Sequence, residues 1–275
     1  MKIRQLIWII SFVFVSAALH SCEEKQELVI PEEAEDDIVF NVNGVSFKMV
    51  KMEGSIFRMG SDGVLFEVVE NETPSHNVSL SDYYIGETEV TQELWVAVMG
   101  NNPSAQNHAE SNTCPVENVS WDDCQMFIDS LNAITGRVFS LPTEAQWEYA
   151  ARDGIELSEY LFSGSDNIQK VCWYSGNTPS SRSVKGKEPN KIGLYDMSGN
   201  VAEWCNDWYG MYSGSFQEDP IGHHSGTKRV IRGGGWTSSE KDCRNTARDC
   251  QTPDFKNSSL GFRLALSYKA SVEEK

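Results

Sequence analysis

Two carboxylates, Asp196 and Glu203, stand seven residues apart on either side of the turn Gly199-Asn200. Calcium takes about six to eight oxygen ligands, drawn from carboxylates and from the backbone carbonyls of such turns. The spacing is therefore compatible with a calcium site to which both side chains contribute. The simpler interpretation is a turn held by Asn200 with two solvated acids, and the spacing by itself does not choose between the two.

A second group of residues that could bind a ligand lies nearer the C-terminus, where Arg232 is followed by three glycines and Trp236. Glycines allow positive φ angles and close approach of the backbone. Arg244, Arg248 and Arg263 follow along the same segment. A planar guanidinium can clamp an anion or a peptide, or it can form ion pairs that order the loops. We favour ion pairing for Arg263 and keep Trp236, Arg244 and Arg248 as candidate binding residues.

Other chemistries have little support in the sequence. No Gly-x-Ser-x-Gly nucleophile motif occurs, and the glycine cluster lacks the lysine and the following helix of a phosphate-binding loop. No CxxC pair is present, and the histidines do not stand at zinc-ligand spacing from cysteines. The formal charge of −17 disfavours nucleic acid and anionic lipid as partners of the domain. It favours solubility, and divalent cations where carboxylates converge.

Three segments begin with a side chain that can cap a helix and end close to a glycine. The predicted helices span residues 92–99 after Thr91, residues 121–132 after Ser120 and residues 145–152 after Thr143. Short β-like runs lie at residues 45–49, 55–59 and 228–232. Long turn-rich stretches, residues 155–192 above all, separate these elements. A few helices and short strands among long loops predict an α+β fold.

The N-terminus has the pattern of a bacterial lipoprotein signal. Lys2 and Arg4 precede an apolar stretch, residues 7–19, that is shorter than a membrane span. A small residue, Ser21, then stands directly before Cys22. Cleavage at this point would leave Cys22 as a lipidated first residue, and its acyl chains would hold a soluble domain at a membrane surface. Ordinary secretion, with Cys22 as a spare thiol, is the alternative.

The chain divides into four predicted segments. No internal repeat and no linker rich in Pro, Gly or Ser splits the central part of the sequence, and the residues after Cys22 are acidic and poor in aromatics. The segments are a signal peptide at 1–21, an acidic tether at 22–44, one folded domain at 45–268 and a tail at 269–275.

Beyond Cys22 the chain has six further cysteines. An even number of cysteines in an exported protein suggests up to three disulfides. Six thiols allow about 15 pairings, and the sequence by itself cannot choose among them. We therefore predict that disulfides form, but the spacing of the cysteines does not tell which cysteines pair.

Six blocks in order over residues 45–266 resemble the formylglycine-generating-enzyme, or sulfatase-modifying-factor, family. The blocks are 57–60 (FRMG), 84–91 (YIGETEVT), 115–121 (PVENVSW), 137–152 (RVFSLPTEAQWEYAAR), 193–204 (GLYDMSGNVAEW) and a last one that runs from Arg232 through Cys243-Arg244 to 261–263 (GFR). The resemblance implies a C-type-lectin-like fold with little regular secondary structure and long ordered loops. Eight tryptophans suit a core of large rings beneath such loops.

The resemblance also implies a set of calcium ligands. They are the Asp196 side chain, the backbone oxygens of Gly199 and Val201, and the Glu203 carboxylate. A second calcium site of the family should fall within residues 165–190, where this sequence shows no matching pattern. We therefore predict one calcium ion with a structural role.

A copper(I) site is implied as well, and this chain lacks half of it. Catalytic members have a serine in the glycine turn and two cysteines beyond it, and thiolates are the fitting ligands for copper(I). Their oxidase activity converts a cysteine of an unfolded sulfatase peptide to formylglycine. In this sequence Gly235 stands at the serine position, Ser238 at the first cysteine and Cys243 at the second. A hydroxyl cannot replace a thiolate, so Cys243 alone remains as a candidate catalytic residue.

We expect copper to be absent and Cys243 to serve a disulfide. Cys205 and Cys243 each close a family block near the presumed site, so the resemblance suggests that they pair with each other. The favoured function is a lipid-anchored binding or scaffold protein of the cell envelope, facing the periplasm or the cell surface. Its partner would be an envelope protein or a peptide, with carbohydrate a lesser option. The alternative is a copper-dependent oxidase for exported sulfatases that recruits another thiol, such as Cys250.

Overall fold

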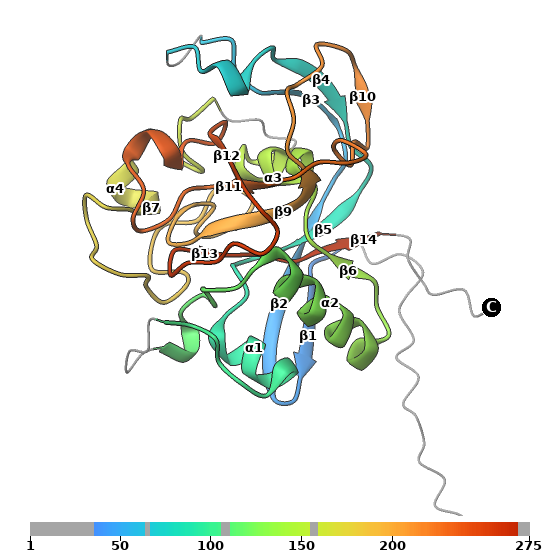
Figure 1. Cartoon of the computed structure of the whole chain (residues 1–275), viewed down its shortest axis with the longest axis vertical. Coiled ribbons are helices and arrows are strands. Elements are labelled where there is room, and N and C mark those ends of the chain that lie inside the picture. The colour runs from blue at the N-terminus through green and yellow to red at the C-terminus, as the bar shows by residue number, and fades with distance from the viewer. Residues whose placement is uncertain (1–35, 64–66, 106–110, 155–158, 269–275) are drawn as a thin grey trace, which may run out of the picture. The chain divides into compact units, whose positions relative to one another are not determined.

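The computed structural model describes residues 36–63, 67–105, 111–154 and 159–268. The predicted signal peptide, the lipidation site Cys22 and the tail at 269–275 lie outside these ranges. Within them, no helix is both long and apolar enough to cross a membrane. The predicted α+β architecture is confirmed, because short helices and strands alternate with long loops (Figure 1).

The regular elements are short. The strands are β1 (Ile38–Val42), β2 (Val45–Met52), β3 (Ile56–Met59), β4 (His76–Ser79), β5 (Tyr83–Gly86), β6 (Phe139–Ser140), β7 (Cys172–Trp173), β8 (Ser198–Gly199), β9 (Ala202–Trp208), β10 (Gln217–Glu218), β11 (Arg229–Arg232), β12 (Arg248–Gln251), β13 (Leu260–Gly261) and β14 (Ala265–Ser267). The helices are α1 (Gln92–Met99), α2 (Trp121–Thr135), α3 (Glu144–Ala151) and α4 (Ile168–Val171). Short 3₁₀ turns lie at Glu70–Glu72, Ser111–Thr113 and Glu240–Cys243.

The strands form several small sheets. The largest has the order β1-β2-β5-β14-β6, with every neighbouring pair antiparallel. A four-stranded sheet has the order β12-β11-β9-β13, in which β13 runs parallel to β9. Smaller sheets have the orders β10-β4-β3 and β7-β8. Because β14 lies between β5 and β6, the C-terminal end of the domain is built into the same sheet as its first strands.

The predicted boundary between tether and domain at residue 45 is wrong. Strand β1 already pairs with β2, with Ile38 opposite Met49 and Val42 opposite Val45. The two strands are joined by Asn43 and Gly44, which adopt positive φ angles of 50° and 88°. An Asn-Gly pair between alternating apolar residues is a strong hairpin signal, because both central positions of such a turn need positive φ. The folded domain therefore includes residues 38–42.

The three predicted helices are confirmed, and their caps explain where they begin. The caps and stops are Thr91 and Gly100 for α1, Ser120 and Gly136 for α2, and Thr143 and Arg152 for α3. In α2 the Ser120 hydroxyl accepts a hydrogen bond from the Asp123 N–H at 3.0 Å, and the Asp123 carboxylate accepts one from the Ser120 N–H at 2.9 Å. These bonds satisfy backbone donors that every helix start leaves without an intrahelical partner.

Large aromatic rings build the interior, as predicted. One core lies beneath α1 and α2, where the ring of Phe127 packs against Trp95 and Phe262 with centroids 5.1 and 5.4 Å away. A second core surrounds α3, which contacts β3, β9 and β11 (Figure 1). There Phe57 packs against Tyr149 at 5.1 Å, and Trp147 is fully buried. The second core also includes Leu194 and Met197, which stand on either side of Asp196 in the sequence.

Candidate functional site

The glycine turn after β11 is closed by its own hydrogen bonds. Gly233 and Gly234 adopt positive φ angles of 85° and 63°, which glycine reaches without strain. The Ser238 hydroxyl accepts a hydrogen bond from the Gly235 N–H at 3.0 Å, and the Ser238 N–H donates to the Gly235 carbonyl at 2.8 Å. The serine at the predicted first copper position therefore holds the turn together.

Position 235 has no room for a side chain. A Cβ atom added there would lie 2.7 Å from the Ser259 carbonyl oxygen and 3.0 Å from the Ala202 nitrogen, and both of these are backbone atoms. The next residue, Trp236, donates its indole N–H to the Ser258 carbonyl at 2.8 Å. The ring of this predicted binding residue is half-buried, and it fixes the turn to the neighbouring loop.

Cys243 lies in a small apolar cluster with Cys172, and both side chains are fully buried. Cys205 belongs to the α3 core instead, so the predicted Cys205–Cys243 pairing is wrong. Among the cysteines that the structure describes, no disulfide is formed. Cys250, the thiol named for the alternative oxidase, lies on β12 opposite Val230. Sequence adjacency to the glycine turn therefore did not identify the neighbour of Cys243.

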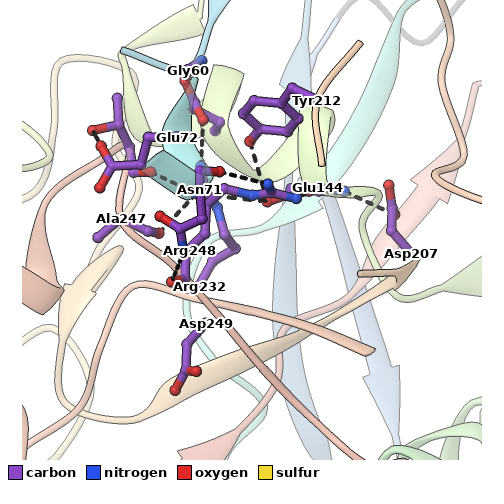
Figure 2. A network of polar contacts seen from close by, with 12 residues as sticks. Gly60, Asn71, Glu72, Glu144, Asp207, Tyr212, Arg232, Ala247, Arg248 and Asp249 are labelled. Carbon is purple, nitrogen blue, oxygen red and sulfur yellow. Dashed lines mark hydrogen bonds and ion pairs between the residues drawn. The ribbon is translucent and has the colours of Figure 1, made fainter. Parts of the chain in front are cut away.

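Four buried arginines are each paired with a buried glutamate, and we call this set the arginine–glutamate network. The pairs are Arg232–Glu148 at 2.5 Å, Arg244–Glu72 at 2.6 Å, Arg248–Glu144 at 2.5 Å and Arg263–Glu203 at 2.7 Å. The partners lie between 60 and 172 residues apart in the sequence. Figure 2 shows Glu144, Arg232 and Arg248 close to one another beside Tyr212.

Arg248 uses its donors inside the protein. Its Nε and Nη2 atoms donate to the two Glu144 oxygens at 2.5 and 2.7 Å, and Nη1 donates to the carbonyls of Asn71 and Gly210 (Figure 2). The guanidinium also packs on the Tyr212 ring, 3.8 Å from its centroid. Burial raises the pKa of Glu144, but the neighbouring guanidiniums lower it further, so it lies below its ordinary value. Glu144 is therefore ionised and pairs with a cation.

Arg244 has a similar role. Its Nη1 and Nη2 atoms donate to the two oxygens of Glu72 at 2.9 and 2.6 Å, and Nε donates to the Lys241 carbonyl at 2.9 Å. A buried charge is stable only when it is paired and hydrogen-bonded. Arg244 and Arg248 therefore each form a buried ion pair, and their binding of a ligand stays a prediction. Ion pairing was the favoured interpretation for Arg263, and it is confirmed.

The predicted calcium ligands come together, but they are not equally available. Both oxygens of Glu203 accept hydrogen bonds from Arg263 at 2.7 Å, and Trp147 donates to one of them. The Oδ2 atom of Asp196 accepts from the Lys185 N–H at 2.8 Å. Its Oδ1 atom is buried and has no hydrogen-bond partner among the described residues. A buried carboxylate oxygen without a hydrogen-bond partner is well suited to be a ligand of a cation.

A third acid, Glu89, joins this turn and was missed in the sequence. Its carboxylate accepts a hydrogen bond from the Val201 N–H at 3.2 Å. Burial, and then the charge of Asp196, raise the pKa of Glu89 well above its ordinary range. Burial likewise raises the pKa of Asp196 to about 6. Three carboxylates face the guanidinium of Arg263. The charge of the cluster can therefore be balanced by one more cation or by protons.

Among the described residues, no group of three or more His, Cys, Asp or Glu side chains is arranged so that these side chains alone could hold a metal ion. A calcium ion at this turn would therefore depend on backbone oxygens as well as on Asp196. In the region of the second family site, Trp173 instead takes the Lys187 ammonium over its ring, 4.0 Å from the centroid. A cation–π contact helps to order this loop.

A cavity of about 260 Å³ lies beside the network. Its lining includes Arg58, Asp62, Arg152, Tyr160 and Arg244. The two signs of charge and the aromatic ring suit a polar peptide segment better than a purely apolar ligand. Arg244 thus lines this cavity while its guanidinium is held by the buried Glu72.

The comparisons with known proteins agree with this fold. Residues 41–268 match the family described as sulfatase-modifying factor enzyme 1-like domain, and the chain belongs to that family. The domain therefore has the C-type-lectin-like fold that the resemblance implied. The solved structure of Treponema denticola variable protein 1 has a TM-score of 0.79 and 34% identity, and covers 84% of this chain and 99% of that chain.

Two curated relatives differ in their described roles. The chaperone protein LppX of Paenibacillus barcinonensis is 31% identical over 251 residues, covering 73% of this chain and 84% of that protein. The formylglycine-generating enzyme of Streptomyces coelicolor is 29% identical over 283 residues, covering 78% of this chain and 88% of that protein. Family membership by itself therefore does not decide between catalysis and another role.

The network predicts a large difference between buried and exposed arginines. Replacing Arg232 by alanine removes the closest cation of the buried Glu148 carboxylate and leaves it the longer contact with Arg152 at 3.4 Å. We expect the free energy of unfolding to fall by about 3–5 kcal/mol. The control is Arg58→Ala, because Arg58 pairs with Asp62 at an exposed position. There we expect a loss of about 0–1 kcal/mol. Urea denaturation at pH 7 measures both, and similar losses would contradict the assigned role.

Proposed function

We propose that this chain is an exported, lipid-anchored binding or scaffold protein of the cell envelope, whose formylglycine-generating-enzyme-like domain does not carry out copper chemistry. The observation that carries the proposal is the closed glycine turn. Gly235 has no room for the serine of catalytic relatives, and Ser238 is bonded within the turn. Cys243 is buried in an apolar cluster. These residues do not fit a pair of thiolates exposed to a peptide substrate.

The anchor and the partner rest on separate support. The pattern that ends in Cys22 favours a lipidated N-terminus and therefore a periplasmic or surface location. The similarity to a protein named as a chaperone favours binding of a protein or peptide over catalysis. The cavity lined by Arg58, Arg152 and Tyr160 is where we place the binding surface. Carbohydrate is a lesser option, and the acidic charge disfavours nucleic acid.

The oxidase alternative is tested with a cysteine peptide derived from a sulfatase. The domain without residues 1–22 is loaded with copper(I) and incubated with the peptide and oxygen, and mass spectrometry follows conversion to formylglycine. The enzyme from Streptomyces coelicolor serves as the positive control. We expect no turnover, because position 238 offers a hydroxyl that cannot hold copper(I). Turnover that is abolished in Cys243→Ala would overturn the non-catalytic proposal.

The lipid anchor is tested on the full chain. We expect the unaltered chain to sediment with membranes and to carry acyl chains on Cys22. Cys22→Ala should be recovered without acyl chains in the fraction that does not sediment, because it lacks the acceptor thiol. Sedimentation of both chains to the same extent would contradict lipid anchoring.

We also propose that a calcium ion has a structural role at the Asp196 turn. The Asp196 side chain and the backbone oxygens of Gly199 and Val201 would hold it, and it would neutralise part of the acidic cluster. The unpartnered Oδ1 atom of Asp196 and the excess of carboxylates over guanidinium support this proposal. Arg263 already holds Glu203, which therefore contributes less than the family pattern implies.

Calcium binding predicts a rise in thermal stability with calcium concentration, since a ligand of the folded state stabilises it by mass action. Differential scanning fluorimetry at pH 7.5, with and without millimolar calcium, measures the midpoint. We expect the increase to disappear in Asp196→Ala and to persist in Asp62→Ala, which removes an exposed acid elsewhere. A midpoint that does not change with calcium would mean that Arg263 and protons alone neutralise the cluster.

A further inference from the structure

Two cysteines that stand 71 residues apart in the sequence meet inside the domain. Cys172 begins β7, and Cys243 ends the 3₁₀ turn Glu240–Cys243. Both side chains are fully buried in the same apolar cluster, and the thiols lie near enough to interact with each other. Phe162, Ile168 and Val171 complete this apolar cluster. The side chains of the cluster therefore offer each sulfur atom little polar contact other than the second sulfur.

The backbone holds the two thiols together through contacts of its own. Strand β7 pairs with β8, with Cys172 opposite Ser198. The Ser175 N–H donates to the Ser238 carbonyl at 3.1 Å, which ties the loop after Cys172 to the loop before Cys243. The Asn245 N–H donates to the Leu161 carbonyl at 2.9 Å on the other side of Cys243. The proximity is therefore a property of the fold and not of a freely moving loop.

Two glycines make the space that the sulfur atoms occupy. A Cβ atom added to Gly199 would collide with the Cys172 sulfur. One added to Gly234 would lie 3.0 Å from the Cys243 sulfur. Both glycines also adopt positive φ angles, so the turns on either side leave this space without strain.

We propose that Cys172 and Cys243 form a disulfide in the mature protein. The proposal rests on the export that the proposed function includes, because disulfides form and persist in oxidising compartments. In the reaction each thiol loses its hydrogen and a bond forms between the two sulfur atoms. The two electrons and two protons pass to the disulfide of an external thiol–disulfide oxidant, which leaves as two thiols.

Burial determines when this bond can form. An oxidant cannot reach two fully buried sulfur atoms in the folded domain, so the exchange takes place while the chain folds. Once formed, the bond is protected from reductants for the same reason. The disulfide then joins the loop of the glycine turn to the β7–β8 pair, which leads into the Asp196 turn. It also removes Cys243 as a possible copper ligand. The disulfide and the closed glycine turn would therefore both disfavour copper binding.

The test starts from the full chain isolated from cells that export it. Thiols are alkylated under denaturing conditions without reductant, and proteolysis with mass spectrometry maps the linked peptides. We expect a linked pair that contains Cys172 and Cys243, with neither residue alkylated. Reduction of the linkage in denaturant, followed by refolding, should lower the thermal midpoint by several degrees, because the chain loses its cross-link.

Alanine variants separate the bond from simple packing. Cys172→Ala and Cys243→Ala should each abolish the linked peptide and lower the midpoint, and the double variant should lower it little further because one bond is lost in every case. Cys205→Ala is the control: it removes a buried thiol from the α3 core and should leave the linked peptide intact. Independent, additive losses of the two single variants would overturn the proposal.

A refolding arm distinguishes failure of the bond from failure of export. The reduced full chain is refolded with oxidised glutathione, and the same peptides are mapped. Alkylation of both thiols in the chain from cells would overturn the disulfide. If the two peptides are then linked in the refolding arm, the assumption of export is wrong. If they are not linked there either, the two thiols are not positioned to form a disulfide. Both thiols reduced with one bound copper ion would overturn it in favour of the oxidase.

Discussion

The arginine–glutamate network is the interaction on which the rest of this domain depends. Its members come from loops and short elements that have few regular hydrogen bonds of their own, and each pair joins segments far apart in the sequence. Taking a charge out of water costs several kcal/mol, and a well-placed opposite charge offsets this cost. Fixing long loops costs conformational entropy as well. The network connects the loops, the two aromatic cores and the glycine turn.

This arrangement has a direct consequence for function. Arg244 and Arg248 have the right chemistry to clamp a peptide carboxylate, but buried glutamates already hold their guanidiniums. The glycine turn, beyond which the family resemblance places the copper ligands, is closed by Ser238 and packed against neighbouring backbone. One accessible cavity lies beside the network, with Tyr160 and charges of both signs in its lining. Recognition of a partner is therefore more compatible with this geometry than oxidation chemistry.

The sequence predicted what is encoded locally and missed what depends on distant contacts. Helix caps such as Ser120 were predicted because a cap and its partner lie three residues apart. The overall fold was predicted from resemblance, since six ordered blocks identify a family that periodicity alone would not. The glutamate partners of the arginines, and the neighbour of Cys243, have no local signal because the chain brings them together over 60 residues or more. The Asn43-Gly44 hairpin did have a local signal, which was overlooked.

A double-mutant cycle on Arg248 and Glu144 tests the central claim most directly. Arg248→Met and Glu144→Leu are made singly and together, and the free energy of unfolding is measured by urea denaturation. Arg248→Met removes the closest cation of Glu144 and leaves it the longer contact with Arg232 at 3.7 Å, while Glu144→Leu leaves Arg248 only backbone carbonyls. We therefore predict losses of about 3–5 kcal/mol for each and a much smaller loss for the pair than their sum. Losses that add to within about 0.5 kcal/mol, or a stable Arg248→Met domain, would contradict a structural role for the network.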